Sequence, residues 1–332
     1  MERGLNLKNL KMAPVFIASP VMPIIIEQIE RKFTVIKFYE YADQAAFLEN
    51  QASQIKAAVV GYNQPFFNAM SFKNFPNLEI VSSFGVGYDH VDVKAAHEHN
   101  VVVTNTPDVL TDEVADLAMG LLIATLRRIP QADQYVRDGN WLAKGAFPLS
   151  DTIQGKTMGI VGFGRIGKAI AKRAKAFGVK LVYHGRTQQS EAKLRYYANL
   201  VEMAKVVDIL MVITPGGLTT HHLINAQVLE ALGSKGTLIN VARGSVVDEA
   251  ALVGALASGK LGAAGLDVFE TEPCAPNELI SMPNVVLLPH IASASHHTRN
   301  LMGKLVADNI ISWLSGKGPK TPVAETPYIK RA

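Results

Sequence analysis

The segment Lys156–Thr187, KTMGIVGFGRIGKAIAKRAKAFGVKLVYHGRT, carries the pattern that decides the fold of this chain. An apolar run over residues 157–161 leads into a glycine-rich turn, Gly162-Phe163-Gly164-Arg165-Ile166-Gly167. Apolar residues then recur at helical spacing through residue 177, and residues 179–183 have the composition of a second buried strand. Strand, glycine turn, helix and strand in this order are typical of a dinucleotide-binding βαβ unit.

Each glycine of the turn has a distinct expected role. Gly162 allows the tight turn, Gly164 lets the backbone approach a pyrophosphate, and Gly167 lets the helix pack closely on the strand. Free amides at the helix N-terminus then face the phosphates. The alternative is a glycine turn that binds nothing, because 26 glycines produce chance matches to the motif.

The end of the second strand bears on which dinucleotide binds. An NAD site usually carries Asp or Glu there to hold the ribose hydroxyls. Residues 168–190 contain no Asp or Glu, and the strand ends in His184-Gly185-Arg186-Thr187. A guanidinium and a hydroxyl can hydrogen-bond to a 2′-phosphate that a carboxylate would repel. We therefore expect NADPH as the preferred cofactor, held in part by Gly185, Arg186 and Thr187; the alternative is that Arg186 is a solvated turn residue.

Length and composition point to a cytoplasmic enzyme. A chain of 332 residues with 48% apolar and 19% charged residues is expected to fold into two globular domains. The net charge of +4 is small and scattered, which suits an anionic cofactor and substrate and gives no reason to expect nucleic acid. One cysteine, Cys274, excludes an internal disulfide. Residues 1–13 lack the apolar core of a signal peptide, and no apolar run has membrane-spanning length.

Short apolar runs alternate with amphipathic segments in both halves of the chain. The pattern predicts an α/β protein of two doubly wound parallel-sheet domains. Residues 106–128 are predicted to form one long connecting helix that Thr106-Pro107 opens. Residues 298–313 form a final amphipathic helix in this interpretation, and the Gly- and Pro-rich tail after it is expected to pack little.

Three chemically active side chains follow strands of the second half. Arg243 follows one predicted strand, Glu272 the next and His290 the last. Because carboxyl ends of parallel strands share one edge of a sheet, we expect the three to converge beside the nicotinamide. The set suits reduction of a 2-keto acid: Arg243 holds the carboxylate and polarises the carbonyl, His290 delivers a proton, and Glu272 orients the imidazole. Each residue alone is equally compatible with a solvated loop position. No His, Cys, Asp and Glu cluster has metal-ligand spacing, so no metal is expected.

Five stretches together resemble the D-isomer-specific 2-hydroxyacid dehydrogenase family over essentially the whole chain: VGFGRIG, TPDVLTDEVADLAMGLL, INVARGSVVDEAAL, GLDVFETEP and LLPHIASAS. The stretches SSFGVGYDHVD and HGRT are similar to its glyoxylate/hydroxypyruvate reductase branch, and hydroxyphenylpyruvate reductases are also similar. The resemblance implies a Rossmann NAD(P)-binding domain at residues 106–295. It also implies a flavodoxin-like substrate domain at residues 1–105 plus 296–332, with the active site in the cleft.

The resemblance also implies roles for individual residues. Arg243, Glu272 and His290 become the catalytic set, with His290 as the acid. The amides of Val86 and Gly87 bind the substrate carboxylate, although Ser82–Asp89 is equally compatible with a plain βα turn. The residues implied to line the nicotinamide half are Thr214, Pro215, Val241, Ala242, Asp267 and Ala292. The subunits are implied to form a homodimer through the cofactor domains, with Trp141 reaching the partner's site; simple packing is the alternative for Trp141.

The sequence thus predicts an NADPH-preferring reductase that converts glyoxylate and hydroxypyruvate to D-2-hydroxy acids. Within the same chemistry, bulkier aromatic keto acids such as hydroxyphenylpyruvate are the alternative substrates. A different class is a dinucleotide-sensing, corepressor-like binding module, which shares the fold and much of the catalytic set.

Overall fold

The computed structural model describes residues 14–61 and 66–328, and the chain divides into two compact units. The first unit comprises Met1–Leu110 with Ser295–Ala332, and the second is Thr111–Ala294. The sequence placed these divisions after residues 105 and 295. Residues 1–13, on which the signal-peptide argument rests, lie outside the described residues.

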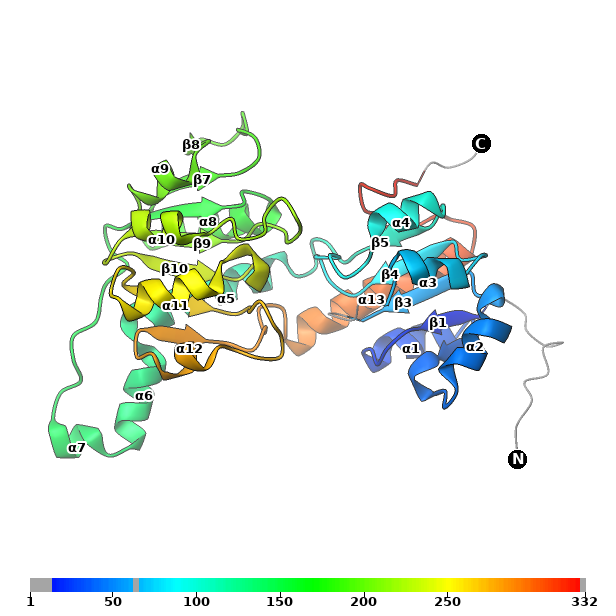
Figure 1. Cartoon of the computed structure of the whole chain (residues 1–332), viewed down its shortest axis with the longest axis horizontal. Helices are drawn as coiled ribbons and strands as arrows, with labels where there is room; N and C mark the ends of the chain where they lie inside the picture. Colours follow the sequence, from blue (N-terminus) through cyan, green and yellow to red (C-terminus); the bar gives the residue numbers. More distant parts are fainter. Residues whose placement is uncertain (1–13, 62–65, 329–332) are drawn as a thin grey trace. The chain divides into compact units, whose positions relative to one another are not determined.

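The first unit contains a parallel five-stranded sheet in the order β2-β1-β3-β4-β5 (Figure 1). This is the flavodoxin-like strand order. Its elements are β1 (Val15–Ile17), α1 (Pro23–Glu30), β2 (Val35–Lys37), η2 (Phe38–Glu40), α2 (Gln44–Asn50), η3 (Ala52–Gln54), β3 (Ala57–Val60), α3 (Ala69–Asn74), β4 (Ile80–Ser83), α4 (Val93–Glu98), β5 (Val102–Thr104) and α13 (His296–Leu314). The three inner strands β1, β3 and β4 are buried along their whole length, as expected of a sheet covered on both faces.

The expectation that the C-terminal tail packs little is wrong. Val323 and Thr326 are 5% and 3% exposed. The Val323 N–H donates to the carbonyl of Val103 (2.9 Å), and the Val103 N–H donates to Thr326 Oγ1 (2.9 Å). The tail satisfies backbone groups along β5, an edge strand, which gives a Gly- and Pro-rich segment a packed structure without a helix or strand of its own.

The second unit contains a parallel seven-stranded sheet in the order β12-β11-β10-β9-β6-β7-β8. Its strands are β6 (Thr157–Val161), β7 (Lys180–His184), β8 (Arg195–Tyr197), β9 (Ile209–Val212), β10 (Thr237–Asn240), β11 (Ala263–Leu266) and β12 (Val285–Leu287). The strand order reverses between β6 and β9, where parallel sheets bind ligands beyond the carboxyl ends of the strands.

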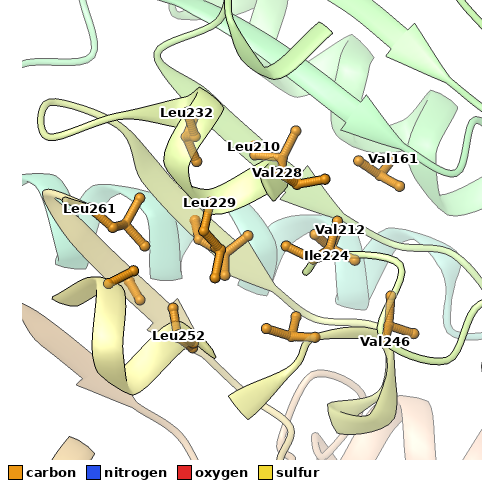
Figure 2. Packing of buried hydrophobic residues seen from close by; sticks show 14 of the residues in the cluster. Val161, Leu210, Val212, Ile224, Val228, Leu229, Leu232, Val246, Leu252 and Leu261 are labelled. Atoms are coloured by element: carbon orange, nitrogen blue, oxygen red, sulfur yellow. The ribbon is translucent and has the colours of Figure 1, made fainter. Parts of the chain in front are cut away.

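Helices cover both faces of this sheet. They are α5 (Thr111–Arg127), α6 (Ile129–Arg137), α7 (Asn140–Lys144), α8 (Arg165–Ala176), α9 (Leu200–Ala204), α10 (Ala226–Leu232), η4 (Gly244–Val246), α11 (Glu249–Ala257) and α12 (Asn277–Ser281). Successive strand residues serve opposite cores: Ile209 packs with α5 and α8, and Leu210 packs with α9, α10 and α11. Figure 2 shows side chains of the second of these cores, among them Leu210 and Val212 of β9, Leu229 of α10 and Leu252 of α11. Burial of the strands on both faces produces the continuous apolar runs seen in the sequence.

Two details of the structure differ from the prediction. The helix predicted over residues 106–128 begins only at Thr111. Before it, Pro107 supplies no N–H, Asp108 has a positive φ of 69°, and the Thr106 N–H donates to the carbonyl of Gly85 (2.8 Å). The sheet also has the edge strand β8, which the apolar pattern does not reveal because its three residues, Arg-Tyr-Tyr, are exposed or half-buried. Within the described residues, no helix is long and apolar enough to cross a membrane.

Candidate active site

The glycine turn lies between β6 and α8, with Gly164 as the N-cap of the helix. Gly162 has a φ of 100°, and a Cβ there would come within 2.8 Å of the backbone of Ile213 and Thr214. A Cβ on Gly167 would overlap the carbonyl oxygen of Gly162. A Cβ on Gly164, by contrast, would meet nothing within 4 Å. The first and third glycines are therefore required by packing, and the second leaves open space beside free helix amides, which fits a dinucleotide pyrophosphate.

The end of β7 has the polarity that a phosphate requires. Arg186 and Thr187 are exposed. The next carboxylate along the chain, Glu191, is paired with Lys168 at 3.2 Å. The residues present at this strand end therefore fit a 2′-phosphate.

The loops that follow β10, β11 and β12 are in register. Asn240 pairs with Leu266, and Leu266 pairs with Leu287. Arg243 and His290 each lie three residues beyond these paired positions, at the same edge of the sheet. Between them runs the loop after β11, against which Gly244 packs so tightly that any Cβ there would overlap the backbone of Phe269. The structure thus brings the segments that carry the three predicted catalytic residues to one edge.

His290 is held by a carboxylate. Its Nδ1 lies 2.8 Å from Glu272 Oε2, and both side chains are largely buried, at 18% and 17% exposed. The other carboxylate oxygen of Glu272 accepts from the Phe269 N–H (3.2 Å). The hydrogen bond expected between these two side chains is therefore present, and Glu272 fixes the tautomer and orientation of the ring, which directs Nε2 away from it.

Asp267 clamps the loop that carries His290. Its side chain is fully buried, and its two carboxylate oxygens accept from the N–H groups of Ile291 (2.7 Å) and Ala292 (2.9 Å). Its carbonyl accepts from the His290 N–H (2.8 Å), and His290 has a positive φ of 54°. Three hydrogen bonds to Asp267 thus hold a positive-φ backbone conformation that is uncommon in residues other than glycine. Sequence reasoning assigned Asp267 and Ala292 to the nicotinamide and did not detect this clamp.

Arg243 follows β10 and is half-buried, and its Nη1 donates to the carbonyl of Ala242 (2.8 Å). Val241 and Ala242 before it are 5% exposed. Thr214 and Pro215 follow β9, beside the glycine turn. These positions all belong to the carboxyl edge of the seven-stranded sheet.

Val86, Gly87 and Trp141 lie elsewhere in the fold. Val86 and Gly87 follow β4 in the first unit, where the carbonyl of Val86 accepts from Asn105 Nδ2 (2.9 Å). Trp141 lies on α7 of the second unit and is 65% exposed. Their predicted contacts with substrate or a partner subunit stay predictions.

A second histidine–carboxylate contact involves Glu270, on the loop that also carries Glu272. The Nε2 of His222 lies 2.5 Å from Glu270 Oε1. The Glu270 N–H in turn donates to Glu249 Oε1 (2.8 Å). Burial raises the pKa of the Glu249 carboxyl, the Glu270 N–H opposes the increase, and repulsion from Glu270 and Glu272 adds to it. Among the described residues, no group of three or more His, Cys, Asp and Glu side chains could hold a metal ion.

Residues 119–292 match the family described as D-isomer specific 2-hydroxyacid dehydrogenase, NAD binding domain. The chain belongs to this family. The match covers the glycine turn, Arg243, Glu272 and His290, so all three side chains lie within the NAD-binding domain of a 2-hydroxyacid dehydrogenase.

Relatives in the 2-hydroxyacid dehydrogenase family are similar over almost their whole length. The glyoxylate/hydroxypyruvate reductase A HPR2 of Arabidopsis thaliana is 45% identical over 93% of this chain and 98% of its own. The hydroxyphenylpyruvate reductase of Plectranthus scutellarioides is 46% identical over the same shares. Among solved structures, the NADPH-dependent glyoxylate/hydroxypyruvate reductase of Sinorhizobium meliloti, in complex with NADP and malonate, is 48% identical. The two structures superimpose over 97% of this chain and 99% of the Sinorhizobium meliloti chain, with a TM-score of 0.89.

Proposed function

We propose that this protein is an NADPH-preferring reductase that converts small 2-keto acids, glyoxylate and hydroxypyruvate, to D-2-hydroxy acids. The observation that carries the proposal is the largely buried hydrogen bond of 2.8 Å between His290 and Glu272. The loops that carry these two residues follow strands in register with β10, whose loop carries Arg243. The similarity to glyoxylate/hydroxypyruvate reductases supports this choice of substrate.

In the proposed reaction, bound NADPH supplies the hydride that reaches the carbonyl carbon of the keto acid. The His290 imidazolium donates its proton from Nε2 to the carbonyl oxygen. Arg243 binds the carboxylate and stabilises the negative charge that develops on that oxygen. Glu272 keeps the ring aligned and favours its protonated form.

The preference for NADPH rests on the end of β7. Arg186 and Thr187 are exposed there, and residues 168–190 contain no carboxylate that would repel a 2′-phosphate. The solved relative of Sinorhizobium meliloti, which is NADPH-dependent and contains NADP, supports the same cofactor.

Aromatic 2-keto acids are the second candidate substrates, because the hydroxyphenylpyruvate reductase of Plectranthus scutellarioides is 46% identical. The two substrate classes share the chemistry of Arg243 and His290, so only the size of the accepted side chain separates them.

We also propose that the enzyme is a cytoplasmic homodimer. Large apolar side chains are exposed on α6, α7 and the segment that follows, among them Val136 (53%), Trp141 (65%) and Leu149 (98%). Such a surface is more often covered by another subunit than left in water. Sedimentation of the protein and of Trp141→Ser at several concentrations tests this.

Initial rates with glyoxylate, hydroxypyruvate and hydroxyphenylpyruvate, each with NADPH and with NADH, test the proposed function. We expect the highest kcat/KM with a small keto acid and NADPH. Faster reduction of the aromatic acid would favour the second candidate. Tight binding of NADPH without oxidation by any of the three acids would replace the reductase with a dinucleotide-binding module.

A further inference from the structure

The segment Gly185–Gln188, which follows β7, is fastened at both ends by hydrogen bonds with residues of a largely buried aromatic group. Phe163, Tyr183 and Tyr196 form this group: the rings of Phe163 and Tyr183 lie 4.6 Å apart, and those of Tyr183 and Tyr196 lie 5.3 Å apart. Tyr183 is fully buried and Phe163 is 8% exposed. The group therefore forms a fixed base beneath the exposed Arg186 and Thr187.

The entrance to the segment is held by Tyr196 on the edge strand β8. Its hydroxyl donates to the carbonyl of Gly185 (3.1 Å). The strand is itself anchored, because Tyr196 pairs with Tyr183 across the sheet and His184 Nδ1 lies 2.9 Å from the carbonyl of Tyr197.

The exit from the segment is held by Gln189. Its N–H donates to the hydroxyl oxygen of Tyr183 (2.9 Å), and its Nε2 donates to the carbonyl of Phe163 (2.8 Å) inside the glycine turn. The amide orientation is determined, because exchanging oxygen and nitrogen would place two acceptors against each other. Gln189 thus ties the segment that carries Arg186 directly to the loop that faces the pyrophosphate.

We propose that Tyr196 and Gln189 are positioning residues that preorganise Arg186 and Thr187 for the 2′-phosphate of NADPH, and that they set the preference for NADPH over NADH. This inference rests on the proposed function for its choice of cofactor. Fastening both ends of the segment removes ordering entropy that would otherwise be lost when the phosphate binds. NADH lacks the 2′-phosphate that Arg186 and Thr187 are proposed to bind, so loss of their preorganisation should weaken the binding of NADPH and not that of NADH.

Conservative variants test the two fastenings separately. Tyr196→Phe keeps the ring and removes only the hydroxyl, and Gln189→Met keeps the length of the side chain and removes only the amide. Tyr197→Phe is the matched control, since the Tyr197 hydroxyl makes no hydrogen bond in the part of the chain that the structure describes. The readout is the dissociation constant of NADPH and of NADH from the fluorescence of the bound nicotinamide, and it does not require turnover.

Each variant is expected to weaken NADPH binding about three- to tenfold, as for the loss of one hydrogen bond, with NADH affinity unchanged. The affinity for adenosine 2′,5′-bisphosphate, measured by competition with the dinucleotide, should fall by the same factor. The affinity for AMP, measured in the same way, should stay constant. In an Arg186→Ala background the two variants should have no further effect, because the group that they position is gone.

Equal losses for NADPH and NADH would overturn the proposal, since they would show a general loosening of the domain. A wild-type protein that binds both dinucleotides equally would overturn it as well. If the variants lost affinity for NADPH alone and the wild-type protein reduced no keto acid, the positioning role would stand and only the reductase activity would be refuted.

Discussion

His290 Nδ1 and Glu272 Oε2 lie 2.8 Å apart on loops that leave neighbouring strands, β12 and β11. The contact is largely shielded from water, so the carboxylate acts on the ring with less screening than a surface pair would have. An imidazole held in this way has one nitrogen engaged and the other available to a substrate.

Substitution of His290 or Glu272 should lower the rate of the chemical step without weakening cofactor binding. His290→Asn is expected to lower kcat about 10²- to 10⁴-fold, the usual contribution of a general acid, with the dissociation constant of NADPH unchanged. In Glu272→Gln the amide oxygen can still accept from the His290 ring, while the charge and the acceptor for the Phe269 N–H are lost, so we expect a smaller loss of kcat. A kcat for Glu272→Gln equal to that of the wild type would contradict this role.

Asp267 should contribute to both stability and turnover. In Asp267→Asn an amide replaces one of the two buried carboxylate oxygens, and one N–H of Ile291 or Ala292 loses its acceptor. A buried unsatisfied N–H costs about 1–3 kcal/mol, which urea denaturation can measure. The value of kcat should fall as well, because the backbone at His290 is released. Asp308→Asn, at an exposed pair with Lys320, is the control and should change neither quantity measurably.

Glu249 makes the stability of the second unit depend on pH. Because burial raises its pKa in the folded protein, its contribution to stability is complete below the unfolded-state pKa and is lost as the pH rises through the folded-state pKa. Glu249→Gln keeps the acceptor for the Glu270 N–H and removes the charge. We expect the melting temperature of the variant to exceed that of the wild type at neutral pH, and the difference to shrink as the pH approaches 4.5, the ordinary value of the carboxyl. Glu230→Gln, at an exposed pair with Lys260, should show no such trend.

The C-terminal tail should stabilise the first unit through one hydroxyl. Thr326→Val preserves the shape of the side chain but leaves the buried Val103 N–H without its acceptor. We expect a loss of about 1–3 kcal/mol in the free energy of unfolding. Thr326→Ser retains the hydroxyl and should recover most of the loss; an equal loss in both variants would mean that the methyl group, not the hydrogen bond, matters.

Local pattern was sufficient for the buried strands. The apolar run predicted over residues 157–161 has the bounds of β6 in the structure, because strands covered on both faces are apolar without interruption. The segment 106–110 was assigned to a helix, because its sequence alone does not show that the carbonyl of Gly85 takes the N–H of Thr106. The tail was misjudged for the same reason, since its partner Val103 lies more than two hundred residues earlier in the chain.

The sequence by itself determined the βαβ unit, the glycine turn and the three chemically active residues after successive strands, because these depend on local periodicity and on where strands end. Only the tertiary structure decided how those residues are held. Three sets of contacts join segments that become neighbours only through strand order and register. They are the Asp267 clamp, the hydrogen bonds of the Tyr183 and Tyr196 hydroxyls near Arg186, and the pairing of His222 with Glu270. Hydrogen bonds between such segments depend on how closely the fold places donor and acceptor atoms. The spacing of residues along the chain does not encode those atomic positions.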